Sequence, residues 1–404
     1  MLHPDEAWQR IAQHCAPLPE VEVERRAAAG LVLARSLAAT VDVPAADVSA
    51  MDGYALAGPV PPGEPRPVAK TIAAGDAPGF VLQPPAVARI MTGAPVPRGA
   101  DRVIPVEMSR TGSAEDAGDR SSVVFQAAAG PGDHIRRRGE VVQTGAPLLP
   151  AGALLTPGAL ALLATHGHAA LPVHRPPSVA ILTTGDEVVP AEVEPEPGQL
   201  RDSHTDFLTA AGAALGLRFH ALGIAPDREE PLALLIESGL YFDVLLLCGG
   251  VSKGEFDFVE GALAEHDCTI HLDGVAIQPG SPFVFATHPG GLVFGLPGNP
   301  ASVMVTFWLF VRPALRRLLG FKGDWWSDFL PGVLTHPLPG AGSRDRFISA
   351  EIELRDGTIR ATPYPPKGSH DLAAYAHGSA LVRVRAGAAP AVAGAPCEVL
   401  LLPV

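Results

Sequence analysis

The chain has 404 residues, 47% of them apolar, and a formal net charge of −13 at pH 7. This length exceeds one ordinary domain and predicts about two to four domains with a large buried interior. The acidic balance argues against a nucleic-acid backbone or an anionic membrane as a partner, because either would repel this surface.

The cysteines and the apolar stretches limit the class of protein further. The four cysteines are far apart and form no C-x-x-C pair, so neither a zinc site nor a disulfide framework is indicated. The segment MLHPDEAWQR has acids where a signal peptide would have basic and apolar regions. The longest apolar stretch, near 303–311, is too short to span a bilayer. We therefore expect a cytoplasmic protein with reduced thiols and no membrane segment.

The first part of the chain is predicted to consist mainly of short strands. Residues 1–16 have the spacing of an amphipathic helix. Residues 20–175 are rich in proline and glycine, with short alternating apolar patterns that are typical of strands. One further helix is expected at 154–166.

From residue 178 onward, strands and helices are predicted to alternate. Strands are expected within 178–189, 219–225, 243–250 and 291–296, and helices within 200–217, 228–240, 258–266 and 300–320. Asn299 and Pro300 are the expected N-cap and first residue of the last helix. This order predicts a doubly wound, mostly parallel sheet. Residues 326–404 return to short strands.

Three loops that follow successive strands carry glycines and acids. They comprise residues 184–187, 249–257 and 295–300. Ligands of such sheets bind outside the carboxyl ends of the strands, where glycines let backbone N–H groups approach phosphate oxygens. Carboxylates such as Glu187 and Asp257 cannot contact phosphate directly, so their presence beside it implies a bridging Mg²⁺.

A second interpretation of the middle loop stays open. Gly250, Ser252 and Gly254 fit the G-x-S-x-G nucleophile elbow of serine hydrolases. However, no oxyanion motif precedes this serine, since the only related pattern, at 288–291, follows it. The common nucleotide fingerprints G-x-G-x-x-G and G-x-x-x-x-G-K-[ST] are both absent from the sequence.

Taken together, seven segments resemble the molybdopterin molybdenumtransferase family, which includes MoeA and the E domain of gephyrin. In chain order they are SAMDGYAL, IMTGAPVPRGADRVIPVE, IRRRGE, LTTGDEVV, GGVSKGEFDF, PGSPFVF and GLPGNPAS. The resemblance extends over nearly the whole chain. It implies Mg²⁺-dependent insertion of molybdate into adenylylated molybdopterin, with release of AMP.

The resemblance also implies a domain organisation and an assembly. The expected parts are an N-terminal helix (1–20) that packs with the α/β domain, a linker and β domain (21–46 and 138–175), a β-rich lobe (47–137), the α/β molybdopterin-binding domain (176–325) and a C-terminal β domain (326–404). The implied assembly is a homodimer whose active site is shared between subunits. Transient contacts with the molybdopterin adenylyltransferase and with recipient molybdoenzymes are further expectations.

The resemblance, together with the three loops, implies a set of site residues. The expected catalytic residues are Asp52, Thr92, Arg136, Glu187, Asp227 and Asp257, and Glu187 and Asp257 are the expected metal ligands. The expected substrate-binding residues are Gly185, Asp186, Ser203, Gly249, Gly250, Ser252, Lys253, Pro297, Gly298, Asn299, Pro300, Arg344 and Ser369.

The chain departs from the family pattern at three places. An expected aspartate is replaced by Val141, two expected lysines by Gln278 and Ser281, and an expected asparagine by His204. Lys253 is a candidate replacement for the missing cations. Besides the active transferase, a weakened paralogue that binds or delivers molybdopterin or molybdate and the serine hydrolase therefore stay open.

Overall fold

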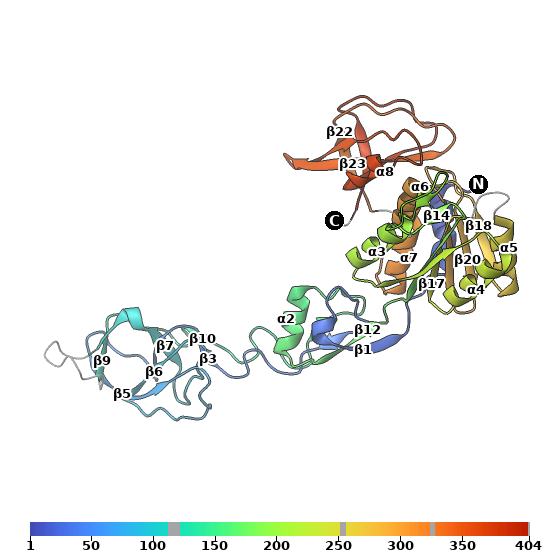
Figure 1. Cartoon of the computed structure of the whole chain (residues 1–404). Helices are drawn as coiled ribbons and strands as arrows, with labels where there is room; N and C mark the ends of the chain where they lie inside the picture. Colours follow the sequence, from blue (N-terminus) through green and yellow to red (C-terminus); the bar gives the residue numbers. More distant parts are fainter. Residues whose placement is uncertain (112–121, 251–255, 324–327, 403–404) are drawn as a thin grey trace. The chain divides into compact units, whose positions relative to one another are not determined.

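The computed structural model, shown in Figure 1, describes residues 1–111, 122–250, 256–323 and 328–402. The chain forms two compact units. The larger unit comprises Met1–Arg35, Gly152–Thr156 and Ala170–Val404, and the smaller unit comprises Ser36–Ala151 and Pro157–Ala169. Within the described ranges, no helix combines the length and apolar character needed to cross a bilayer. All four cysteines are free thiols.

The larger unit is built around a six-stranded sheet with the order β16-β13-β17-β21-β20-β18. Its strands are β13 (Val179–Thr184), β16 (Phe219–Ala225), β17 (Val244–Cys248), β18 (Thr269–Asp273), β20 (Val284–His288) and β21 (Gly291–Leu296). The first four strands of the order are mutually parallel, and β20 is antiparallel to both its neighbours. The predicted doubly wound, mostly parallel sheet is present.

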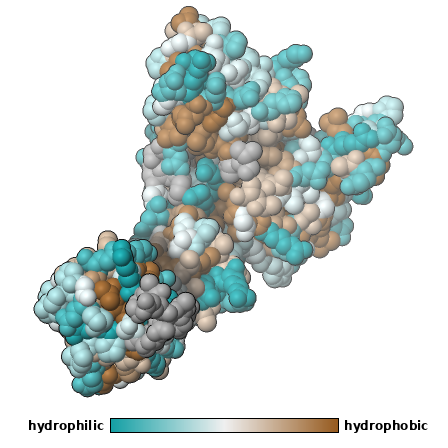
Figure 2. Space-filling view, turned by 90° about the vertical axis from the view of Figure 1, so that its left-hand side faces the viewer, coloured by the Kyte–Doolittle hydropathy of each residue, from teal (hydrophilic) through white to brown (hydrophobic). Residues whose placement is uncertain are grey.

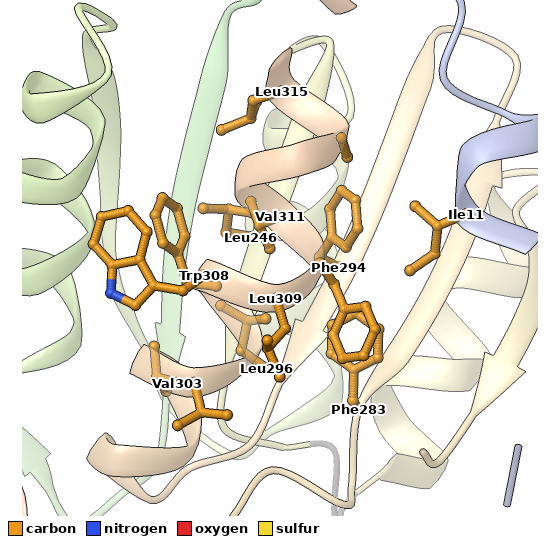
Figure 3. Packing of buried hydrophobic residues seen from close by; sticks show 14 of the residues in the cluster. Ile11, Leu246, Phe283, Phe294, Leu296, Val303, Trp308, Leu309, Val311 and Leu315 are labelled. Carbon is orange, nitrogen blue, oxygen red and sulfur yellow. The ribbon is translucent and has the colours of Figure 1, made fainter. Parts of the chain in front are cut away.

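Helices cover both faces of this sheet because the strand side chains alternate between two cores. Ile181 and Leu246 belong to one buried cluster, whereas Leu182 and Leu245 belong to the other. The first cluster includes α1 (Pro4–Gln13), α3 (His204–Ala214), α6 (Pro300–Thr306), the π-helical segment η3 (Phe307–Val311) and α7 (Arg312–Leu318). The second includes α4 (Glu229–Gly239) and α5 (Phe256–Glu265). Figure 3 shows the first cluster, which contains both Ile11 of α1 and Phe294 of β21.

The helix predicted at 300–320 contains a π-helical segment. Asn299 and Pro300 occupy the predicted N-cap and first helical positions. Pro313 has no backbone N–H, so the carbonyl four residues earlier loses its usual partner. The Thr306 hydroxyl also donates to the Ser302 carbonyl at 2.7 Å, just before the π-helical segment begins. Both features loosen the regular α-helical pattern at the centre of this run.

The C-terminal strands form a closed barrel in the same unit. They are β22 (Phe329–Leu334), β23 (Asp345–Arg355), β24 (Thr358–Pro363), β25 (Ala380–Val384) and β26 (Pro396–Leu401), accompanied by α8 (Leu372–Ala376). The order β23-β24-β22-β26-β25 closes through a β23–β25 pairing. The short strand β19 (Ile277–Gln278) adds to β23. Arg383 further links the barrel to α1, since Nη2 lies 2.7 Å from the buried Asp345 carboxylate and 3.1 Å from that of Asp5.

Two small strand pairs complete the larger unit. Strands β1 (Glu20–Glu24) and β12 (Ala170–His174) pair in antiparallel fashion, and η1 (Arg25–Ala27) follows β1. Strands β14 (Val188–Val189) and β15 (Leu200–Arg201) form a short parallel pair, and β14 directly follows the glycine-bearing loop at 184–187.

The smaller unit is mostly β-structure. Its elements are β2 (Leu37–Ala38), β3 (Val48–Ser49), β4 (Gly53–Leu56), β5 (Pro65–Ile72), β6 (Val87–Ile90), β7 (Arg102–Pro105), η2 (Val106–Met108), β8 (Ser109–Thr111), β9 (Ser122–Phe125), β10 (Ile135–Arg136), β11 (Pro147–Leu149) and α2 (Pro157–Thr165). Six strands form a sheet in the order β7-β4-β6-β5-β9-β8, and β3 pairs with β10. The helix predicted at 154–166 begins at Pro157, a residue that suits the first turn of a helix.

Figure 2 shows one face of the molecule coloured by hydropathy. In Figure 2, hydrophobic residues occur in small groups among hydrophilic ones. Single exposed apolar side chains of this kind are usual on folded proteins.

Candidate functional site

The three glycine-bearing loops lie at the carboxyl ends of the adjacent strands β13, β17 and β21. The close approach of the first two loops depends on glycine, because a Cβ at Gly249 would lie 2.7 Å from the Thr184 carbonyl oxygen. Gly249 and Gly250 also have positive φ angles of +92° and +63°, which glycine adopts without strain. A Cβ at Gly298 of the third loop would lie 3.7 Å from the Gly249 Cα. The structure therefore brings all three loops together.

A buried hydroxyl faces this group of glycines. A Cβ on either Gly249 or Gly250 would lie 2.9 Å from Thr184 Oγ1. This hydroxyl has no hydrogen-bond partner among the described residues. A polar group that is buried next to closely packed backbone fits a site that is completed by a ligand or by water.

Three carboxylates gather at the first loop and the end of β16. The backbone amide of Asp227 donates to Asp186 Oδ1 at 3.1 Å, and the amide of Asp186 faces Asp227 Oδ2 at 3.4 Å. Burial raises the pKa of Asp227, and the negative charges of Glu187 and Asp186 raise it further. Three acids so placed repel one another, and a divalent cation would relieve that repulsion.

The described part of the chain does not contain a complete metal site. No group of three or more His, Cys, Asp or Glu side chains placed to hold a metal ion occurs in 1–111, 122–250, 256–323 or 328–402. Asp257 is the second residue of α5, but its side chain lies outside the described part. Ser252 and Lys253 also lie outside the described residues. The nucleophile elbow and the proposed compensating lysine therefore stay predictions.

A cavity of about 670 Å³ lies in the larger unit, between the α/β loops and the barrel. Among the expected site residues, its lining includes Glu187, Pro297, Gly298, Asn299, Arg344 and Ser369. Pro300 begins helix α6 directly after these loop residues. The backbone amide of Ala301 donates to the Ser369 carbonyl at 3.2 Å, which attaches the barrel loop to the start of α6. The volume fits a small-molecule ligand.

Helix α3 begins at the same end of the sheet, and its cap was missed by the sequence analysis. Ser203 is the N-cap residue, but its side chain makes no capping bond. Instead, Asp202 Oδ1 accepts from the His204 and Thr205 amides at 2.9 and 3.2 Å, and Oδ2 accepts from the Thr205 hydroxyl at 2.6 Å. An aspartate directly before a predicted helix is the pattern that would have identified it.

His204 connects this helix to the third loop. Its ring is buried beside the Gly298 backbone, and its Nδ1 has no hydrogen-bond partner among the described residues. Burial lowers the pKa of His204, although the Asp202 charge and the Gly298 backbone act in the opposite direction. The expected asparagine is thus replaced by a buried imidazole next to the Gly298 loop.

The smaller unit holds the other expected catalytic residues. Asp52 Oδ1 accepts from the Thr92 amide at 2.7 Å and from the Thr92 hydroxyl at 2.8 Å. These hydrogen bonds, the backbone one first, lower the pKa of Asp52. Arg136 lies exposed in β10, which pairs with β3 just before Asp52. The structure thus brings Asp52 and Thr92 into direct contact.

The two arginines after Arg136 have structural partners. Arg137 Nη1 lies 2.7 Å from the Asp47 carboxylate, and Arg138 Nε lies 2.5 Å from that of Asp42. No ion pair involves Arg136 within the described ranges. Of the three arginines, Arg136 is the one whose charge stays available to a ligand.

Comparisons with known proteins agree with this arrangement along the whole chain. Residues 2–167 match the MoeA N-terminal region (domain I and II), residues 180–317 a "Probable molybdopterin binding domain", and residues 331–402 the MoeA C-terminal region (domain IV). These matches define the class as MoeA-like proteins of molybdopterin biosynthesis.

Similar proteins narrow the class to one family. The chain is 35% identical over 397 residues to molybdopterin molybdenumtransferase 2 of Mycobacterium tuberculosis, with 95% of each chain covered. It is 36% identical over 346 residues to the molybdopterin molybdenumtransferase of Nostoc sp., covering 83% of this chain and 78% of the relative. A crystal structure of the molybdopterin biosynthesis MoeA protein from Pyrococcus horikoshii superposes with a TM-score of 0.82 at 28% identity, covering 100% of this chain and 99% of that one.

The chain belongs to the molybdopterin molybdenumtransferase family, whose members are enzymes of molybdenum cofactor biosynthesis. The family resemblance and the predicted fold class are both confirmed by these findings.

Proposed function

We propose that the chain catalyses Mg²⁺-dependent insertion of molybdate into adenylylated molybdopterin, with release of AMP. The observation that carries this proposal is the cavity of about 670 Å³, where Glu187 and the Gly298 loop face Arg344 and Ser369. In this proposal Glu187 is the carboxylate that binds the metal, and Arg344 is the cation that binds the oxyanion. Both line the same cavity, whose volume suits a small ligand.

The residues at the first two loops fit Mg²⁺. Carboxylate oxygens are the ligands that this ion prefers, and it commonly uses only one or two of them together with substrate phosphate and water. Glu187 and Asp257 would hold the ion, and the charges of Glu187 and Asp186 add to the rise in the pKa of Asp227 that burial mainly causes. Bound there, Mg²⁺ would neutralise charge on the adenylate phosphate and on the departing AMP.

The other residues of the larger unit bind and orient the substrates in this proposal. Backbone N–H groups of Gly250 and Gly298 bind phosphate oxygens, whereas the Gly249 N–H donates to the Leu296 carbonyl at 3.1 Å and joins the second loop to the third. Gly185 permits the first loop, with a φ of +141°. Arg344 and Ser369 hold molybdate by charge-assisted and hydroxyl hydrogen bonds.

Asp52, Thr92 and Arg136 complete the proposed catalytic set. The Thr92 hydrogen bonds keep the Asp52 carboxylate ionised, so it can accept a hydrogen bond or a proton from the substrate. Because these residues belong to the smaller unit, we further propose a homodimer in which they act on the substrate of the partner subunit. The molybdopterin adenylyltransferase and recipient molybdoenzymes are proposed transient partners, and the cytoplasm is the proposed location.

The direct test is AMP release by the purified full-length chain. With adenylylated molybdopterin, Mg²⁺ and molybdate present, we expect AMP to accumulate, as measured by chromatography, and omission of Mg²⁺ to stop it. Asp257→Asn should abolish Mg²⁺-dependent release because the proposed metal loses a charged ligand. Glu265→Gln, at the exposed last turn of the same helix, is the matched control and should behave as wild type.

Two results would contradict this assignment. Undiminished release by Asp257→Asn would remove Asp257 from the metal site. Binding of adenylylated molybdopterin without any AMP release by the wild type would favour the weakened paralogue, for which the neutral residues Gln278 and Ser281 in the cavity lining are the supporting observation.

A further inference from the structure

The cavity has an uneven distribution of charge between its two walls. Its described lining contains three cations, Arg344, Arg346 and Lys367, and one carboxylate, Glu187. All three cations belong to the barrel and its loops, whereas the carboxylate belongs to the α/β loops. Although the chain has a net charge of −13, the barrel side of the cavity is locally positive and suits a small anion.

The α/β wall does not supply a cation from the loop 278–281. Ser281 is 8% exposed, and its hydroxyl donates inward to the Val275 carbonyl at 3.0 Å. It also contacts the Met1 sulfur at 3.2 Å. Gln278 is exposed and neutral. An oxyanion in this cavity therefore finds its countercharge on the barrel side.

Arg346 is already engaged in the fold. Its Nη1 donates to the Gly340 carbonyl at 3.1 Å. The guanidinium charge also acts on the buried Tyr375, where it partly offsets the rise in pKa that burial causes. The Tyr375 hydroxyl in turn donates to the Phe347 carbonyl at 2.7 Å. This network fixes the start of β23 and leaves less of Arg346 free for a ligand.

Lys367 has a fixed backbone and an exposed side chain. Asp371 accepts the Lys367 amide at 2.9 Å and the Ala374 amide at 3.2 Å, so it caps α8 and holds the loop. Two residues further along from Lys367, the Ser369 carbonyl is tied to the Ala301 amide of α6. The lysine therefore projects from an anchored loop, and an ammonium with three donors suits a tetrahedral oxyanion.

We propose that Lys367 is a substrate-binding residue that adds a second barrel-side positive charge, beside that of Arg344, for molybdate in this cavity, where the loop 278–281 supplies no cation. This inference rests on the proposed function, because it takes molybdate as the anion bound there. It places the determinant of oxyanion affinity on the barrel.

The test is direct molybdate binding to the full-length chain by calorimetry. Lys367→Ala should raise the Kd for molybdate about tenfold or more, as expected for the loss of one charge-assisted hydrogen bond. Lys367→Arg should keep most of the affinity because it keeps the charge. Adding Gln278→Lys to Lys367→Ala should recover binding, since position 278 lines the same cavity.

Controls separate this role from a structural one. Lys367→Gln replaces the ammonium by an uncharged polar amide and should weaken binding as Lys367→Ala does, with an unchanged unfolding temperature. Lys70→Ala, in the smaller unit where Lys70 lies over the Phe80 ring, should leave the Kd unchanged. An unchanged Kd in Lys367→Ala, with normal binding by the wild type, overturns this assignment alone. A wild-type chain that binds no molybdate overturns the proposed function and this assignment with it.

Discussion

Neighbouring groups shift the pKa values of the proposed site's acids in opposite directions. Asp52 receives two hydrogen bonds from Thr92, which favour the ionised carboxylate and lower its pKa. Asp227 is partly buried beside Asp186 and Glu187, and its pKa is raised. Asp52 is thus stabilised in its ionised form by its own hydrogen bonds. The acids around Asp227 would instead be stabilised in their ionised form by a bound cation.

The contact between Thr92 and Asp52 gives a prediction about pH. Thr92→Val removes the hydroxyl donor but keeps the backbone amide, so the pKa of Asp52 should rise part of the way toward its ordinary value. A ¹³C NMR titration of the Asp52 carboxyl would measure this shift. The acidic limb of AMP release should move to higher pH by the same amount, because Asp52 becomes protonated earlier as the pH falls.

Thr92→Ser is the matched control, because serine keeps a hydroxyl at the same position. It should retain both the lowered pKa of Asp52 and the wild-type acidic limb. If Thr92→Val leaves the pKa of Asp52 unchanged, the hydroxyl does not stabilise the ionised carboxylate.

At the scale of elements, local patterns predicted the α/β core well. The strand expected at 219–225 is β16, with the same bounds, and the Asn299 cap and Pro300 start of the last helix are confirmed. These features can be predicted from short sequence patterns, such as a run of apolar residues or an N-cap residue followed by proline. The π-helical segment was not predicted, because it depends on the combination of Pro313 and Thr306 within an apolar run.

Long-range features were beyond the reach of such patterns. Closure of the barrel pairs Ala350 with Ala380, and nothing in either segment specifies its partner. The same holds for the cations of the cavity, since Lys367 and Gln278 line one space although they lie far apart in the sequence. The sequence did place the three loops after successive strands, and a parallel sheet necessarily brings such loops to one edge.

The loop after β17 supplies a prediction about stability. Gly249→Ala should destabilise the larger unit by about 1–3 kcal/mol, because alanine is strained at positive φ and its Cβ would collide with the Thr184 carbonyl. Gly261→Ala is the matched substitution in the interior of α5, where a Cβ meets nothing within 4 Å. It should stabilise by about 0.5–1 kcal/mol through helix propensity.

Urea unfolding followed by circular dichroism would measure both changes. Equal stability of Gly249→Ala and wild type would show that this loop relaxes without the close approach to Thr184. A loss of stability in Gly261→Ala would contradict the open surroundings of that position.

At the scale of the whole molecule, the proposed catalytic residues are divided between the two compact units. Asp52, Thr92 and Arg136 belong to the smaller unit, whereas the glycine loops and the cavity belong to the larger one. In the proposed homodimer, each active site combines the smaller unit of one subunit with the larger unit of the other. If the site is shared, two variants that are each inactive should complement one another in mixed dimers.

Mixing two inactive variants tests this prediction. In a heterodimer of an Asp52→Ala subunit and an Asp257→Ala subunit, a shared arrangement leaves one site with both substitutions and one site with neither. After subunit exchange, verified with two different affinity tags, AMP release should recover to about a quarter of the wild-type rate, because half the dimers are mixed and each has one intact site. Mixing Asp52→Ala with Arg136→Ala is the control, since both residues lie in the smaller unit and neither site is then intact. Recovery in the first mixture and none in the second would establish that the two units act across subunits, whereas no recovery in either verified mixture would show that each subunit depends on its own Asp52.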